Sequence, residues 1–159
     1  MNMKMSRFIT FTLISIFFIA ISNSCKKDKT SDNTTPSTKS PEELLSANAW
    51  KIEKIRTLQN GSFYYYQRGT SNHDLDNESI NFKTDHTGTY TGPDGTEYAI
   101  SSWNFIDDQK TQIQYLIEFS APLQVNWDNV ALTSTSLRYG EYHNLGGVNT
   151  LSVAKRIPK

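Results

Sequence analysis

The stretch TQIQYLIEF, residues 111–119, decides the fold class of this chain. Its apolar side chains stand at every second position, with Leu116 as the one exception. They are Ile113, Tyr115, Ile117 and Phe119. A period of two is typical of an extended strand in an antiparallel sheet that has one buried face and one face exposed to solvent.

The same alternation extends outward along most of the chain. The further runs are 50–53, 62–67, 78–83, 89–91, 97–106, 130–133, 136–142 and 150–155. The run 97–106 changes phase near Ser101 and Ser102, which indicates a β-bulge. Turn sequences such as 92–95, GPDG, separate neighbouring runs. We expect about eight or nine antiparallel strands, few enough to close into one small barrel.

A short helix is predicted just before the first strand. Ser40, Pro41 and Glu43 occupy the N-cap, N1 and N3 positions of a capping box. The helix has little room, because the strand pattern begins at Trp50. Residues 41–159 are therefore predicted to form one domain, all-β apart from this helix.

The run 62–67 is aromatic on both of its faces. Phe63 and Tyr65 share one face, and Tyr64 and Tyr66 share the other. Only one face of a strand in a barrel can point into the core. Because Phe63 is the most apolar of these residues, we expect its face to be inward and Tyr64 and Tyr66 to lie near water.

Residues 1–24 have the pattern of a secretory signal peptide. Lys4 and Arg7 precede the apolar run 8–21, and the small or polar residues 22–24 follow it. A transmembrane helix is the alternative interpretation. It is less favoured, because a span needs about 20 apolar residues and this run is shorter.

Cys25 is the only cysteine, so the chain can form no internal disulfide. A free exposed thiol is a liability in an oxidising compartment, which favours a modified Cys25 over a spare thiol. Residues 26–40, KKDKTSDNTTPSTKS, contain no large apolar side chain. Residues 25–40 are therefore predicted to be a flexible tether, spanning about 20 Å on average.

The residues before Cys25 resemble the lipobox of bacterial lipoproteins, in the looser form found in Bacteroidetes. Ser22 and Ser24 stand where the usual box has Leu and Ala or Gly. The resemblance implies that Cys25 is acylated and anchors the protein in a membrane. Lys26 stands where Asp signals inner-membrane retention in some bacteria, so the resemblance favours the outer membrane, with its periplasmic and cell-surface faces both open.

The domain resembles the lipocalin-like domains of Bacteroidetes lipoproteins. The resemblance is carried by SANAWKI at 46–52, by SINFKTDHTGTY at 79–90 and by SWNF at 102–105. It implies a small antiparallel β-barrel of about eight strands. It implies no enzyme activity.

A barrel of this size has an interior just wide enough for one small apolar ligand. Inward-facing aromatic residues would line it, and the candidates are Tyr65, Tyr98, Trp103, Tyr115 and Tyr139. The alternative is an exposed aromatic surface that holds another envelope protein or inhibits a hydrolase. Both hypotheses stay open at the level of sequence.

Other chemistry has little support. His73, His86 and His143 fall in predicted loops or turns without shared ligand spacing, so no metal site is expected. Residues 74–78 lack the Gly and the distant Glu of a calcium loop. No Gly-x-Ser-x-Gly elbow occurs, and neither catalysis nor a cofactor is expected. From Cys25 onward, 14 Lys and Arg oppose 16 Asp and Glu, a net charge of −2 that argues against nucleic acid.

Overall fold

The computed structural model describes residues 39–145 and 147–159. The predicted signal peptide, Cys25 and the tether up to residue 38 lie outside the described residues. Within the described part, no helix is long and apolar enough to cross a membrane.

The described chain forms one short helix followed by nine strands. The helix is α1 (Pro41–Ser46), and both halves of the predicted capping box are present. The strands are β1 (Ala49–Gln59), β2 (Ser62–Gln67), β3 (Ser79–Phe82), β4 (Gly88–Thr91), β5 (Glu97–Phe105), β6 (Ile113–Ile117), β7 (Leu123–Leu132), β8 (Leu137–Leu145) and β9 (Val148–Pro158). The predicted all-β class and short helix are confirmed. The sequence pattern found only the end of β7 and half of β1.

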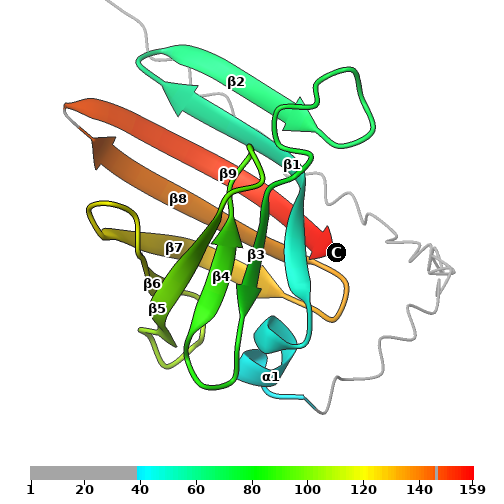
Figure 1. Ribbon diagram of the computed structural model, residues 1–159, viewed down its shortest axis with the longest axis vertical. Helices are drawn as coiled ribbons and strands as arrows, with labels where there is room; N and C mark the ends of the chain where they lie inside the picture. The colour runs from blue at the N-terminus through cyan, green and yellow to red at the C-terminus, as the bar shows by residue number, and fades with distance from the viewer. Residues whose placement is uncertain (1–38, 146) are drawn as a thin grey trace, which may run out of the picture. The chain divides into compact units, whose positions relative to one another are not determined.

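Eight of the strands close into an antiparallel barrel (Figure 1). The hydrogen-bonded order is β1-β3-β4-β5-β6-β7-β8-β9, and β9 pairs again with β1. The register of β5 against β6 shifts between Ile100 and Ser102, which confirms the predicted bulge. Closure of the barrel leaves β2 as an additional strand.

Strand β1 changes its partner halfway along. Residues 49–51 pair with β3, whereas residues 54–59 pair with β2. Its other edge pairs with β9 throughout, with a register shift between Ile52 and Lys54. As a result, β2 and the neighbouring parts of β1, β9 and β8 continue past the barrel wall (Figure 1). We call this part the sheet extension; it comprises residues 54–59, 62–67, 138–145 and 148–155.

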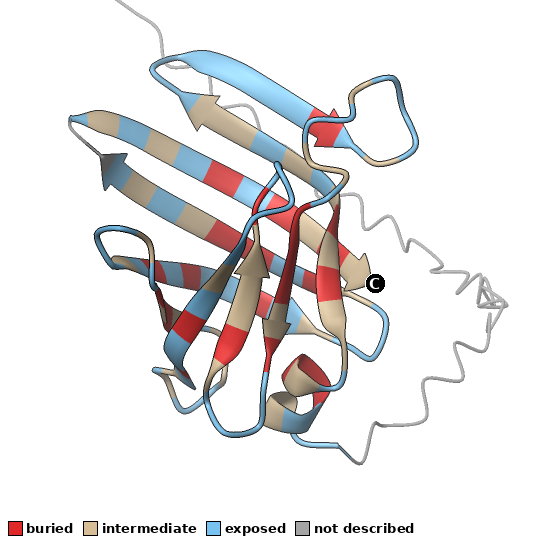
Figure 2. Ribbon diagram, viewed as in Figure 1, coloured by how far each residue is buried: buried red, intermediate tan, exposed pale blue. Residues whose placement is uncertain are grey.

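The end of the barrel beside α1 is filled by side chains. Leu45 and Trp50 are fully buried, and Trp50 Nε1 donates a 2.7 Å hydrogen bond to the Leu45 carbonyl. Phe82 makes edge-on contacts with three rings, at centroid distances of 5.4, 5.6 and 5.7 Å: Trp103, Tyr115 and Trp127. Figure 2 shows that buried residues concentrate in the barrel strands and thin out along the sheet extension. We refer to this filled region as the closed end.

The predicted orientation of β2 is wrong. Tyr66 is fully buried, whereas Phe63 is 63% exposed and Tyr65 is 54% exposed. Tyr64 is 38% exposed, as expected for a residue near water. The prediction assumed that the most apolar face contacts the core. Because β2 lies in the sheet extension, its outward face has no core to contact.

Candidate ligand cavity at the open end of the barrel

A cavity of about 180 Å³ lies inside the barrel at the end opposite α1. Its apolar wall is formed by Ile117, Phe119, Leu123 and Val125. Its polar wall is formed by Glu78, Tyr90, Tyr115, Glu141, His143 and Arg156. We call this space the open-end cavity.

Strand register explains why the apolar wall is continuous. Tyr115 lies opposite Val125, and Ile117 lies opposite Leu123, in the antiparallel pair β6–β7. Cross-strand partners point to the same face of a sheet, and alternate residues along a strand do so too. The alternation in the stretch 111–119 therefore places these side chains together inside the barrel.

Arg156 and Glu78 form a buried ion pair beside the cavity. Arg156 Nη2 lies 2.6 Å from Glu78 Oε1, and only 4% and 9% of the two side chains are exposed. The other guanidinium nitrogens donate to the Tyr139 hydroxyl at 2.9 Å and to the Trp50 carbonyl at 3.2 Å. A buried cation is tolerated when it is paired and hydrogen-bonded in this way. The pair thus forms a rigid, internally neutral wall.

Glu141 and His143 form a second polar pair, two residues apart on the same face of β8. Glu141 Oε1 makes a very short contact with His143 Nε2. Glu141 Oε2 accepts a hydrogen bond from Trp127 Nε1. The hydrogen bond to Glu141 raises the pKa of His143 above its ordinary value of 6.5, although burial opposes the shift. The protonated imidazole is therefore favoured beside this carboxylate.

Two tyrosine hydroxyls are available to a ligand in the cavity. Burial raises the pKa of Tyr115 well above its ordinary value, and burial also raises the pKa of Tyr90. Both rings therefore keep their hydroxyl protons at physiological pH. Within residues 39–145 and 147–159, neither hydroxyl has a hydrogen-bond partner. A tyrosine hydroxyl can both donate and accept, so the site offers hydrogen bonds to a polar ligand group.

The five aromatic residues predicted to contact a ligand lie in different regions of the structure, three at or near the cavity and two elsewhere. Tyr115 lines the cavity. Tyr98 lies behind it, with its ring 4.5 Å from that of Phe119. Tyr139 stacks on Trp127 and supports Arg156. Of these three residues only Tyr115 lines the cavity, whereas Tyr98 and Tyr139 contact residues that line it.

The other two predicted residues lie elsewhere. Trp103 belongs to the closed end and donates from Nε1 to the Lys83 carbonyl at 2.9 Å. Tyr65 is on the outward face of β2, so its prediction as an interior residue is wrong. The cause is the same as for Phe63, since β2 does not belong to the barrel wall.

The charged residues of the cavity were missed by sequence reasoning. His143 was predicted to be a solvated loop residue, but it lies in β8 with 19% of its side chain exposed. In the predicted strand 150–155 the large apolar residues Leu151 and Val153 are exposed, whereas Ser152, Ala154 and the following Arg156 are the buried residues. The sequence did contain a signal for this buried face, because the small side chains of Ser152 and Ala154 alternate with Leu151 and Val153 and lead to Arg156. The signal is weak without knowledge of the strand register.

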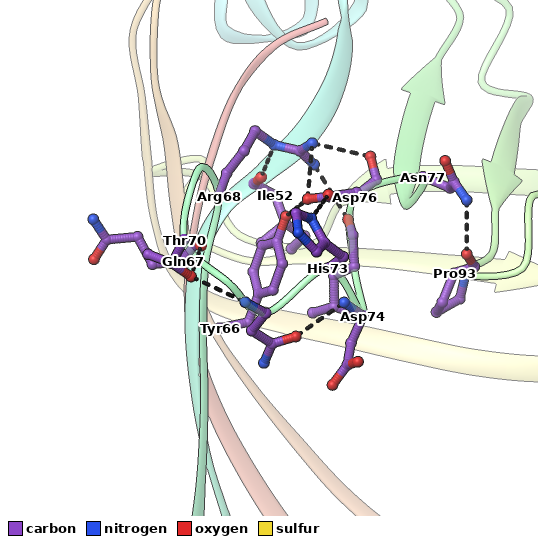
Figure 3. Close-up of polar contacts among 12 residues, drawn as sticks. Ile52, Tyr66, Gln67, Arg68, Thr70, His73, Asp74, Asp76, Asn77 and Pro93 are labelled. Atoms are coloured by element: carbon purple, nitrogen blue, oxygen red, sulfur yellow. Dashed lines mark hydrogen bonds and ion pairs between the residues drawn. The ribbon is translucent and has the colours of Figure 1, made fainter.

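A polar cluster fixes the loop 68–78 that leads into Glu78 (Figure 3). Arg68 Nε donates to the Ile52 carbonyl at 2.7 Å, where β1 changes partner, and its guanidinium lies 3.6 Å from Asp76. Asp76 also bonds to His73 Nδ1 at 2.6 Å and to the Tyr66 hydroxyl. Burial and the Asp76 bond raise the pKa of Tyr66 to about 12. The bonds from Tyr66 and His73 lower the pKa of Asp76.

This cluster is structural in its geometry, because each of its groups is directed at another group of the loop or at the backbone of β1. No set of three or more His, Cys, Asp or Glu side chains in the described residues is placed to hold a metal ion.

Comparison with known proteins adds no relative. No protein-family model matches the chain, and no curated protein or solved structure matches it significantly. The resemblance to lipocalin-like lipoproteins stays a prediction from the sequence.

Proposed function

We propose that the barrel binds one small molecule in the open-end cavity. The observation that carries this proposal is an internal space lined by apolar side chains together with Tyr90 and Tyr115, whose hydroxyls have no hydrogen-bond partner among the described residues. An engineered cavity of about 150 Å³ holds benzene, whereas drug-sized ligands occupy about 300–1,000 Å³. A cavity of about 180 Å³ therefore suits a ligand of roughly one ring.

The ligand is uncharged in this proposal. Arg156 is neutralised by Glu78, and His143 is paired with Glu141, so the cavity has no unpaired charge for an ion to satisfy. Ile117, Leu123 and Val125 favour an apolar body. The hydroxyls of Tyr90 and Tyr115 favour a hydroxyl or amide group on that body. The apolar ligand expected from the sequence is thereby refined to a small amphipathic molecule.

We also propose that this domain is carried outside the cytoplasm, at the outer membrane, on an acylated Cys25. The support is the sequence pattern of residues 1–25, since that segment lies outside the described residues. Mass spectrometry of the N-terminal peptide from the native host tests it directly. Attached acyl chains are expected on Cys25. A soluble product with a free thiol there would contradict the anchor and leave the cavity proposal untouched.

The ligand proposal is tested by titrating the protein with phenol and with benzene, followed by calorimetry or ligand-observed NMR. Both probes are expected to bind, with phenol the tighter, because only phenol can bond to the tyrosine hydroxyls. Val125→Trp should abolish binding of both probes by filling the cavity. Tyr115→Phe should weaken phenol about fivefold to tenfold and leave benzene unchanged.

Tyr64→Phe is the matched control, since it removes an exposed hydroxyl from the sheet extension. It should leave both affinities unchanged. If neither probe binds, or if Val125→Trp binds phenol as tightly as the unaltered protein, the cavity does not serve as a ligand site. If the probes do bind, native mass spectrometry of the protein isolated from its native host is the measurement that would identify the natural ligand.

A further inference from the structure

The outer face of the sheet extension is exposed and rich in large apolar side chains. Most of the highly exposed large apolar residues of the described chain lie on it: Phe63 (63%), Val153 (62%), Tyr142 (57%), Tyr65 (54%) and Leu151 (48%). Soluble monomeric proteins rarely leave such side chains together in water, so a contiguous patch indicates an interaction surface.

Strand register sorts this outer face into rows. One row is wholly apolar and runs across all the strands of the extension: Phe63, Leu58, Leu151 and Tyr142. A second row is cationic on three of its four strands, with Lys54, Lys155 and Arg138 side by side and the neutral Gln67 on β2. Arg56 lies between the rows, opposite Tyr65 and Val153. The two rows are four residues apart along the strands, which is about 13 Å.

The inner face of the extension is apolar next to the barrel, where Tyr66, Tyr139 and Ala154 are buried, and polar toward its far end. Thr57 and Ser152 are cross-strand partners there, and their hydroxyls lie 2.9 Å apart. Gln59 and Thr150 form the next pair along. The far end of the extension is therefore amphipathic, with its apolar side chains turned away from the barrel axis, which leaves one face suited to docking.

Charge is also unevenly distributed. The described residues contain eleven Lys and Arg against fourteen Asp and Glu, a net charge of −3. The outer face nevertheless gathers Lys54, Arg56, Arg138 and Lys155. These cations surround a hollow of about 500 Å³ whose floor includes Val153. The acids nearby are Glu53, which lies 2.5 Å from Lys155, and Asp128, whose carboxylate covers Gly140 on the same outer face. A positive surface thus lies on a negatively charged domain.

We propose that this outer face docks on an anionic lipid surface, with headgroup phosphates on the cationic row and the apolar row in the interfacial layer. A lipid surface has a fixed order of depth, in which anionic groups lie above acyl chains. The rows reproduce that order, with the cationic row next to the barrel and the apolar row toward the far end of the extension. An acidic protein partner requires no such layering, so lipid is the favoured occupant. The docking is independent of Cys25 and of the open-end cavity.

The test uses a chain that begins at residue 25 and carries Cys25→Ser, so that no acyl group can bind vesicles. It keeps every contact described above, since these lie within residues 39–159. Flotation is measured with phosphatidylcholine vesicles and with vesicles that contain about a third phosphatidylglycerol. The protein is expected to float with the anionic vesicles alone, and added salt should weaken the binding.

Variants separate the two rows. Lys54→Gln and Arg138→Gln should each reduce partitioning into anionic vesicles about fivefold. Phe63→Ser combined with Leu151→Ser should reduce it further by removing the inserted side chains. Lys83→Gln is the matched charge control, because Lys83 is exposed in the turn between β3 and β4. It should bind as the unaltered chain does.

A tryptophan at position 63 gives a second measurement that does not depend on flotation. Trp50, Trp103 and Trp127 are buried, so Phe63→Trp adds the one exposed indole of the described residues. Its emission should shift to the blue on anionic vesicles. Three outcomes would overturn the proposal: no binding even at low salt, equal binding to both kinds of vesicle, or outer-face variants that behave like Lys83→Gln.

Discussion

The closed end and the sheet extension share strand β1, but opposite sets of alternate residues in β1 point inward in the two regions. In β1, Trp50 and Ile52 point inward before the irregularity at Glu53, and Thr57 points inward after it. One extra residue in a strand reverses the side that every later residue faces. Leu58 is thereby turned outward. The comparison shows that a bulge and a change of strand partner decide which residues enter the core.

The largest expected difference between the two regions concerns their aromatic residues. Trp50→Ala should lower the free energy of unfolding by about 3–5 kcal/mol, because it empties a filled part of the core. Phe63→Ala, on the outer face, should lower it by no more than about 1 kcal/mol, because the ring loses only exposed contacts, including that with Arg56. Urea unfolding followed by circular dichroism measures both. A large loss in Phe63→Ala would mean that the extension is packed and that the comparison is wrong.

Ion pairs provide the next contrast. Glu78→Gln removes a charge from a buried pair and should cost about 3 kcal/mol, because Arg156 stays buried without its counterion. Glu53→Gln acts on the partly exposed pair with Lys155 in the extension and should cost at most about 1 kcal/mol. The same unfolding measurement compares them. Equal losses of unfolding free energy in the two variants would show that the two ion pairs are equally shielded from solvent.

A smaller effect depends on pH. The pKa of His143 is raised in the folded protein, so its contact with Glu141 stabilises the fold fully below about 6.5 and is lost as pH rises through the folded pKa. The melting temperature of the unaltered protein should exceed that of His143→Gln in mildly acidic buffer, and the gap should narrow in alkaline buffer. NMR titration of the imidazole gives an independent check. A gap that widens with pH would show that the pKa is lowered.

The smallest expected effect is that of Arg56→Gln, which tests whether contacts on the exposed outer face contribute little to stability. Arg56 lies over the Phe63 ring, 4.3 Å from its centroid, on the exposed outer face. Exposed cation–π contacts are worth about 0.5–1 kcal/mol. Arg56→Gln should therefore lower the free energy of unfolding by less than about 1 kcal/mol. A larger loss would indicate that Arg56 has a structural role beyond this ring.

The sequence predicted the parts of the fold that depend on local pattern. The all-β class, the capping box at Ser40 and the bulge near Ser101 follow from short stretches of chain, and the structure confirms them. The alternation in residues 111–119 predicted that Tyr115 faces the interior, and it does so because β6 belongs wholly to the barrel wall. Where a strand stays in one environment, alternation is a sufficient guide.

The remaining features of the fold and of the cavity depended on the pairing of strands that are far apart in the sequence. Tyr65 and Phe63 alternate as well as Tyr115 does, yet nothing local reveals that β2 leaves the barrel wall. Arg156 and Glu78 are 78 residues apart, and only closure of β9 onto β1 brings them together. The cavity therefore required the strand order, and only the β6 side of its apolar wall followed from the sequence pattern, because Leu123 and Val125 lie in the part of β7 that the pattern did not find.

Pairing of β9 with β1 also brings the two ends of the folded domain together. The Lys159 amide donates to the Ala49 carbonyl at 2.8 Å, beside α1 and away from the cavity. A short peptide linker could join these neighbouring ends, and new ends could be opened at the Asn60-Gly61 turn to give a circular permutant. A fluorescent protein fused after Lys159 would leave both the ligand cavity and the outer face unobstructed.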